Sequence, residues 1–242
     1  MGFFEGARGR LHYREWAVEQ PVAGLILLPG LGQHSGHYHR FARQLNAHDI
    51  QVWALDTAGH GLSEGDPDRP GTLRELVDDA ALLIELVRAE QPDRALALMG
   101  HSLGGVTALA ALGAAIPASG DDGEEPAADA VAADYPVIPA PITEALSGVV
   151  LCGVPKRALG GGAPNAPGTP LPRELPVLAV HGVDDRRAPI TAIRVWTRRH
   201  EWVDLREYAD AGHDLLHEPV HARVGADIAE WVRSVVGSVR HR

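Results

Sequence analysis

Short runs of consecutive apolar residues, each closed by Gly, Pro or Asp or by a His-Gly pair, alternate along this chain with longer stretches of helical periodicity. The apolar runs cover residues 25–28, 51–55, 95–99, 148–152 and 177–180. Runs without polar alternation are typical of strands that are buried on both faces of a parallel sheet. Their alternation with helices indicates repeated βαβ units. The pattern therefore predicts an α/β fold with a mostly parallel central sheet flanked by helices.

The intervening helices and the outer strands follow from the same periodicities. Apolar positions at helical spacing predict helices over residues 38–47, 73–89, 103–115, 190–199 and 220–236. Thr72 and Glu75 have the spacing of a capping box at the start of the second helix. Residues 11–18 alternate polar and apolar side chains, which predicts an edge strand, and 203–208 are predicted to form the last strand.

Two stretches interrupt this pattern. Residues 117–143 are rich in Asp, Glu, Ala and Pro, and residues 156–174 are rich in Gly and Pro. We interpret both as irregular insertions on one domain that spans residues 1–242, a length that one α/β core can accommodate. Residues 117–143 could serve as a mobile lid or form a disordered acidic loop, and their composition favours the loop.

Charge and composition exclude several classes of partner. The chain has 22 Lys and Arg against 32 Asp and Glu, a formal net charge of -10, so we expect no nucleic-acid partner. Its single cysteine, Cys152, excludes an intrachain disulfide. No run approaches the roughly 18 to 20 apolar residues of a membrane span, and the first residues do not resemble a secretion signal. We expect a soluble, cytoplasmic protein of undetermined oligomeric state.

The strongest candidate for chemistry is Ser102. It lies between a predicted strand and a predicted helix in the run Gly-His-Ser-Leu-Gly-Gly, residues 100–105. Glycines at positions 100 and 104 remove side chains where a sharp turn brings backbone segments together. This pattern predicts a nucleophile elbow.

A serine nucleophile needs a base to take its proton and a carboxylate to orient that base. Asp184 and Asp185 follow the strand at 177–180, and His213 stands in the loop before the final helix. The order serine, acid, histidine is the order found in proteins with this elbow. The spacing alone leaves both aspartates as candidates.

With these motifs the chain resembles the α/β-hydrolase superfamily. Within it, the chain resembles the monoacylglycerol lipase and lysophospholipase branch, which is similar to the S33 serine aminopeptidases. The matching motifs are residues 29–38, 55–65, the elbow at 100–105 and 213–219. The resemblance implies that the acid is Asp185, three residues after the glycine of the His181-Gly182 pair, and that the base is His213. It implies little or no helical cap, because the Gly- and Pro-rich residues 156–174 occupy the place where relatives carry one.

The resemblance also implies two backbone donors for the oxyanion that forms during acyl transfer. One is the peptide N–H of Leu103, directly after the nucleophile, and the other is the peptide N–H of Leu31 in the loop after the strand at 25–28. Many relatives have a histidine at the position of Pro29, and this difference leaves the Leu31 N–H in place.

Other reactive side chains are interpreted as structural. His60 is expected to hold loops together by hydrogen bonds, and His181 and His217 to have structural or surface roles. His34, His37 and His39 lack a matching carboxylate or cysteine motif for a metal site, so neither a metal nor a cofactor is expected. Cys152, at a strand end, is expected to pack in the core.

These residues favour hydrolysis of a carboxylic ester with a small or medium acyl group, including monoacylglycerol-like esters. A thioesterase or acyltransferase that acts on a carrier-bound or CoA-bound acyl group remains an alternative, because the same three residues serve both reactions. A non-catalytic ligand-binding protein with this fold is a third, disfavoured by the complete set Ser102, Asp185 and His213.

Overall fold

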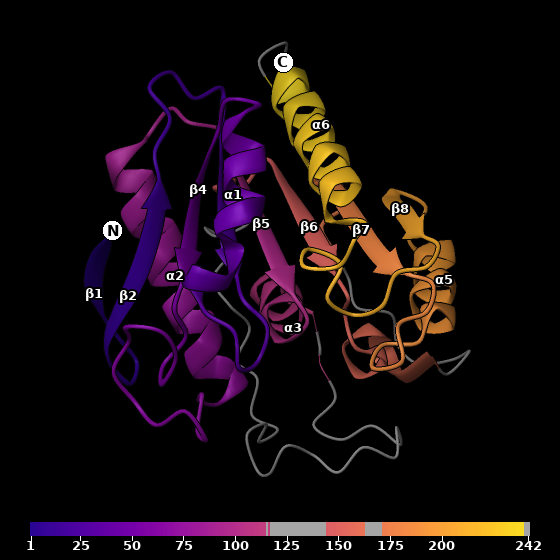
Figure 1. Ribbon diagram of the computed structural model, residues 1–242, viewed down its shortest axis with the longest axis horizontal. Coiled ribbons are helices and arrows are strands. Elements are labelled where there is room, and N and C mark those ends of the chain that lie inside the picture. The colour runs from indigo at the N-terminus through magenta and orange to yellow at the C-terminus, as the bar shows by residue number, and fades with distance from the viewer. Residues whose placement is uncertain (115, 117–143, 163–170, 240–242) are drawn as a thin grey trace.

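The computed structural model describes residues 1–114, 116, 144–162 and 171–239. Within these residues the chain forms an eight-stranded sheet in the order β1-β2-β4-β3-β5-β6-β7-β8 (Figure 1). The strands are β1 (Gly2–Gly6), β2 (Gly9–Trp16), β3 (Ala23–Leu28), β4 (Ile50–Leu55), β5 (Leu96–His101), β6 (Gly148–Cys152), β7 (Val177–Gly182) and β8 (Val203–Tyr208). Strands β3 to β8 are parallel, and β2 runs antiparallel to both β1 and β4. This sheet confirms the predicted fold class.

Helices cover both faces of the sheet. They are α1 (His39–Asn46), α2 (Leu73–Glu90), α3 (Leu103–Ala111), α5 (Ile190–Arg199) and α6 (His221–Val239), with 3-10 helices η1 (Ser35–Tyr38) and η2 (Lys156–Gly162). α1 and α6 share one apolar cluster with one face of the sheet, and α2, α3 and α5 share the other. The capping box of α2 is present, with Thr72 and Glu75 bonded reciprocally.

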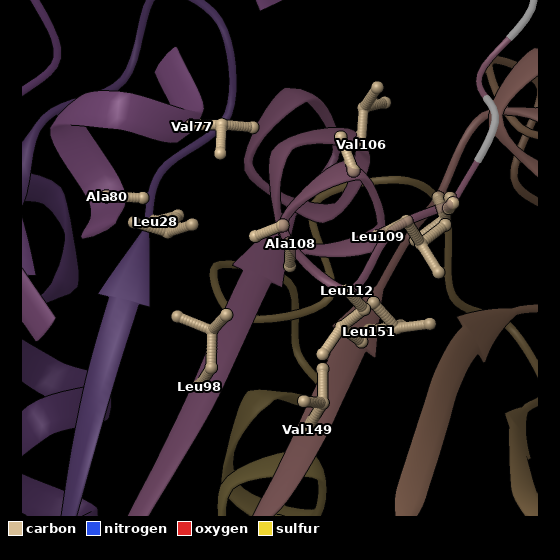
Figure 2. Close-up of a cluster of buried hydrophobic side chains, with 14 of the residues drawn as sticks. Leu28, Val77, Ala80, Leu98, Val106, Ala108, Leu109, Leu112, Val149 and Leu151 are labelled. Atoms are coloured by element: carbon tan, nitrogen blue, oxygen red, sulfur yellow. The ribbon is translucent and has the colours of Figure 1, made fainter. Parts of the chain in front are cut away.

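The core between the sheet and α3 holds the elbow in position. Figure 2 shows Leu28, Leu98 and Val149, from β3, β5 and β6, below side chains of α2 and α3, among them Val77 and Val106. Burying a side chain of this size stabilises the fold by roughly 1.5–3 kcal/mol. Every residue of β5 is buried, so the strand that leads to Ser102 is packed on both faces.

The strand predicted at residues 11–18 is present as β2 (Gly9–Trp16), but its predicted place at the edge of the sheet is wrong. Gly2–Gly6 forms a further strand, β1, which pairs outside β2 from Gly2 opposite Tyr13 to Gly6 opposite Gly9. The alternation in β2 instead arises because its inner side chains, such as Leu11, pack on the core. A five-residue strand with glycine at both ends has too little periodicity to be recognised alone.

Helix α3 ends at Ala111, short of the predicted residue 115. Gly113 has a φ of 85°, and the peptide N–H groups of Gly113 and Ala114 donate to the carbonyls of Ala110 and Leu109. This is a Schellman motif, in which a left-handed glycine ends the helix and satisfies its last carbonyls.

Between β6 and β7, the described residues contain η2 and no longer helix. Lys156–Gly162, predicted to be irregular, forms this 3-10 helix, which packs against α5. The proposed insertion at 117–143 lies outside the described residues, as do residues 163–170 of the second stretch. Among the described helices, none has the length and apolar character needed to cross a membrane.

Candidate active site

Ser102 stands at the tip of the turn from β5 into α3. Its backbone has a φ of 50° and a ψ of -111°, a conformation that residues with a side chain rarely adopt. The turn is held by hydrogen bonds from Ser102 N to Cys152 O and from Gly105 N and Val106 N to Ser102 O. Strain of this kind persists only where the surroundings impose it, and it is common at functional sites.

The two glycines that flank Ser102 are required by close backbone contacts. A Cβ at Gly100 would collide with the carbonyl of Gly104, and a Cβ at Gly104 would collide with the carbonyl of Leu28 at the end of β3. The helix therefore starts in contact with the neighbouring strand. The elbow expected from the sequence is present in the structure.

The structure brings Ser102, His213 and Asp185 together in one line of hydrogen bonds. His213 Nε2 lies 2.9 Å from Ser102 Oγ, and His213 Nδ1 lies 2.8 Å from Asp185 Oδ2. With the proton on Nδ1, His213 donates to the carboxylate and presents the lone pair of Nε2 to the serine hydroxyl. This is the geometry that general-base activation of a serine requires.

Asp185 is buried and its carboxylate bonds His213, whereas Asp184 is exposed. Asp185 Oδ1 accepts the peptide N–H groups of Arg187 and Ala188, both at 2.8 Å. Burial by itself raises the pKa of the Asp185 carboxyl, but hydrogen bonds from His213 and Ala188 outweigh that effect and hold the pKa below its ordinary value. The carboxylate is therefore ionised at neutral pH.

The two expected oxyanion donors lie beside the elbow and in the loop after β3. Leu103 begins α3, where the first peptide N–H groups have no partner within the helix. The N–H of Gly30 faces Gln33 Oε1 and the N–H of Gly32 donates to His60 Nε2 at 3.1 Å. Between them, the N–H of Leu31 has no acceptor among the described residues. Within the described part of the chain, both N–H groups are thus without a protein acceptor.

Several contacts to the His213 loop, residues 209–220, involve residues that the sequence analysis did not single out. Glu218 accepts the peptide N–H of Gly212 at 2.6 Å and that of Asp214 at 3.1 Å. His101, directly before the nucleophile, places Nε2 3.0 Å from the carbonyl oxygen of His213. No sequence signal identified these partners beyond their position inside the motifs.

His101 is also connected to the loop after β3, which carries Leu31 and which we call the oxyanion loop. Its Nδ1 lies 2.9 Å from Gln33 Oε1 and 3.2 Å from the hydroxyl of Tyr38, which also bonds Gln33. Gln33 Nε2 donates to Asp214 Oδ1 at 3.2 Å. Burial lowers the pKa of His101 to about 4, so its ring is neutral at neutral pH.

Four further histidines make contacts within the protein. His60 links the loop after β4 to the oxyanion loop through Gly32, and His181 Nε2 donates to the carbonyl of Ala188 at 2.6 Å. His34 and His37 each accept a peptide N–H of their own turn. Within the described part of the chain, no three His, Cys, Asp or Glu side chains group so that they could hold a metal ion.

Comparisons with known proteins show what the sequence and the fold of this chain are similar to. Residues 19–124 match the family model described as serine aminopeptidase, S33. The chain is 28% identical over 271 aligned positions to a monoacylglycerol lipase of Mycolicibacterium smegmatis, covering 96% of each protein. It is 37% identical over 89 residues to the monoglyceride lipase of Homo sapiens, which covers 37% of this chain and 29% of that protein.

Among solved structures, a thermostable carboxyl esterase from Bacillus coagulans superimposes with a TM-score of 0.72, with 15% identity and 97% of each chain covered. At that identity the likeness shows the fold alone. The chain thus has the fold of the α/β-hydrolases, and the sequence matches make it similar to serine hydrolases. Within that class the chain resembles the monoacylglycerol lipase branch.

Proposed function

We propose that this protein hydrolyses carboxylic esters, with Ser102 as nucleophile, His213 as general base and acid, and Asp185 as the carboxylate that orients His213. One observation carries the proposal: the unbroken line from Ser102 Oγ through His213 to Asp185, with distances of 2.9 and 2.8 Å. The names of the curated relatives, monoacylglycerol lipase and monoglyceride lipase, support ester hydrolysis as the reaction.

The proposed reaction has two halves. Ser102 Oγ attacks the ester carbonyl carbon while His213 Nε2 takes the hydroxyl proton, and the peptide N–H groups of Leu31 and Leu103 bind the oxyanion of the tetrahedral intermediate. The intermediate collapses to an acyl-Ser102 ester, and the alcohol leaves with the proton from His213. Water then attacks the acyl carbon, His213 takes its proton, and collapse releases the carboxylic acid and returns the proton to Ser102.

Asp185 supports both halves without changing its own protonation. Each half passes through a protonated His213, and an ionised carboxylate 2.8 Å away stabilises that cation. The side chain of Asp185 is fully buried, so water weakens this interaction little.

Covalent labelling tests the nucleophile directly. A fluorophosphonate is expected to form one adduct on Ser102 of the wild-type protein, located by peptide mass spectrometry. Ser102→Ala should remove the adduct and ester turnover together, whereas Ser234→Ala, on α6 with its hydroxyl bonded to the carbonyl of Trp231, should leave both unchanged. A folded wild-type sample without an adduct on Ser102 contradicts the proposal.

For the substrate, we propose esters with small or medium acyl groups, including monoacylglycerol-like esters. The names of the curated relatives, monoacylglycerol lipase and monoglyceride lipase, support monoacylglycerol-like esters. A panel of aryl esters and monoacylglycerols of increasing acyl length measures the preference as kcat/KM. Acyl thioesters in the same panel test the alternative, since a kcat/KM for thioesters well above that for matched esters would favour a thioesterase.

A further inference from the structure

His213 stands on a loop between a strand and a helix and is part of neither. Residues 209–220 connect β8 to α6 and contain no helix or strand. A side chain on a loop needs support from outside the loop to keep a catalytic orientation, because a displacement of about 1 Å can cost a hundredfold in rate. Three backbone polar groups around His213 receive that support: the N–H of Gly212, the carbonyl of His213 and the N–H of Asp214.

Glu218 accepts the backbone N–H groups of the two residues that flank His213 in the sequence. Its Oε2 accepts the N–H of Gly212 at 2.6 Å, and its Oε1 accepts the N–H of Asp214 at 3.1 Å. A carboxylate is acceptor-only when ionised, so both oxygens are suited to peptide donors, and bonds to a charged acceptor are stronger than neutral ones. The side chain thus fixes the backbone direction on entering and on leaving His213.

His101 holds the carbonyl of His213, which is on the same peptide group as the Asp214 N–H that Glu218 accepts. The Nε2 of His101 lies 3.0 Å from the carbonyl oxygen of His213. With the ring proton on Nε2, His101 donates to this carbonyl, and Nδ1 is then the acceptor beside the hydroxyl of Tyr38. The ring is 2% exposed and lies 5.3 Å from the His213 ring, centroid to centroid. Because His101 is the residue before Ser102, this bond joins the backbone of the base directly to the turn that carries the nucleophile.

We propose that Glu218 and His101 together are positioning residues for His213, a pair that we call the His213 clamp. The inference rests on the proposed function and deepens it. In the described structure neither side chain hydrogen-bonds Ser102 Oγ or His213 Nε2, and both bond the backbone around the base. Removing the clamp should lower kcat and the rate of covalent labelling while leaving KM and the labelling Ki little changed, since the acyl-binding residues are untouched.

Matched variants of His101 separate positioning from packing. In His101→Gln the amide nitrogen can occupy the place of Nε2 and keep the donor to the His213 carbonyl. In His101→Asn the amide reaches only the place of Nδ1 and the donor is lost. We expect kcat to fall about tenfold in His101→Asn and by no more than about threefold in His101→Gln.

Glu218→Gln keeps one acceptor oxygen but turns an NH₂ group toward the other peptide N–H. We expect a fall in kcat of about tenfold to a hundredfold. Glu230→Gln, at an exposed carboxylate on α6, is the matched control and should keep the wild-type kcat. His48→Gln, at an exposed histidine after α1, is the control for the histidine variants.

All rates are expressed per mole of Ser102 titrated by fluorophosphonate, so that unfolded protein does not enter the comparison. Rates of His101→Asn and Glu218→Gln equal to that of the wild type overturn the clamp, and so does an equal loss in His101→Asn and His101→Gln. A wild-type protein that does not label at Ser102 overturns the proposed function itself, which distinguishes the two failures.

Discussion

Exchanging each of the neighbouring carboxylates, Asp184 and Asp185, for its amide is the sharpest test of the proposed chemistry. The two variants are isosteric with the wild type and adjacent in sequence, but only Asp185 contacts His213. In Asp185→Asn the peptide N–H groups of Arg187 and Ala188 require the oxygen where Oδ1 now lies. The NH₂ group must then occupy the position of Oδ2 and face His213 Nδ1.

That orientation reverses the tautomer of His213. An NH₂ group donating to Nδ1 forces the ring proton onto Nε2, which faces Ser102 Oγ and can no longer accept its proton. We expect kcat to fall about 10⁴-fold, the size of the effect when a triad carboxylate becomes an amide. This corresponds to about 5.4 kcal/mol of transition-state stabilisation.

Ester turnover, measured in parallel with thermal unfolding, decides the outcome. Asp184→Asn should stay within about twofold of the wild type, because its carboxylate is exposed and its peptide N–H still donates to Ala211 O. The reasoning is refuted if Asp184→Asn loses activity while Asp185→Asn keeps it. Retention of more than a tenth of the wild-type kcat by Asp185→Asn refutes the tautomer explanation.

Three further predictions concern stability, measured as the free energy of unfolding in urea. Ser102→Gly should be more stable than Ser102→Ala by about 1–2 kcal/mol, because glycine relieves the strain of the positive φ. Gly104→Ala should destabilise by about 3 kcal/mol, because the methyl group would collide with the carbonyl of Leu28. Burial raises the pKa of the Asp79 carboxyl to about 6. Ionisation of this buried group is therefore unfavourable in the folded state, and the protein loses stability as the pH rises from about 4 to about 6. Asp79→Asn should therefore raise the free energy of unfolding by about 2 kcal/mol at pH 8 and leave it unchanged near pH 3.

Each of these has a matched comparison. Gly237→Ala, on α6 with open space around it, should stabilise by up to about 1 kcal/mol, so a similar gain in Gly104→Ala would contradict the collision. Equal stability of Ser102→Gly and Ser102→Ala would mean that the elbow stores no strain. A pH-independent effect of Asp79→Asn would exclude its carboxyl as the titrating group.

The interior of the fold was predictable because its strands are buried on both faces. The runs at 148–152 and 203–208 coincide with β6 and β8, and the helix at 190–199 coincides with α5. Such segments carry a strong pattern because every side chain is subject to the same burial. The outer strand β1 was missed for the opposite reason, since alternate residues of Gly2–Gly6 are exposed and the segment is short.

Within the site, the sequence could indicate residues but not all of their contacts. Spacing left Asp184 and Asp185 equivalent, and what separates them in the structure is burial and the two peptide donors to Asp185. The hydrogen bond between His101 and the carbonyl of His213 joins residues that are 112 positions apart. Because one partner is a backbone atom, no pattern of side chains in the sequence indicates this bond. The catalytic roles of these residues stay predictions until the variants are measured.

The order of the reactive residues along the chain has a consequence for synthesis. Ser102 follows β5 at the centre of the sheet, whereas His213 follows β8 at the sheet's outer strand. Contacts between such distant segments form late, and a chain emerging from the ribosome presents its earlier segments first. We therefore expect the serine of a nascent chain to remain an ordinary, unreactive alcohol until β8 and α6 have docked, so that a partly folded chain cannot consume acyl esters.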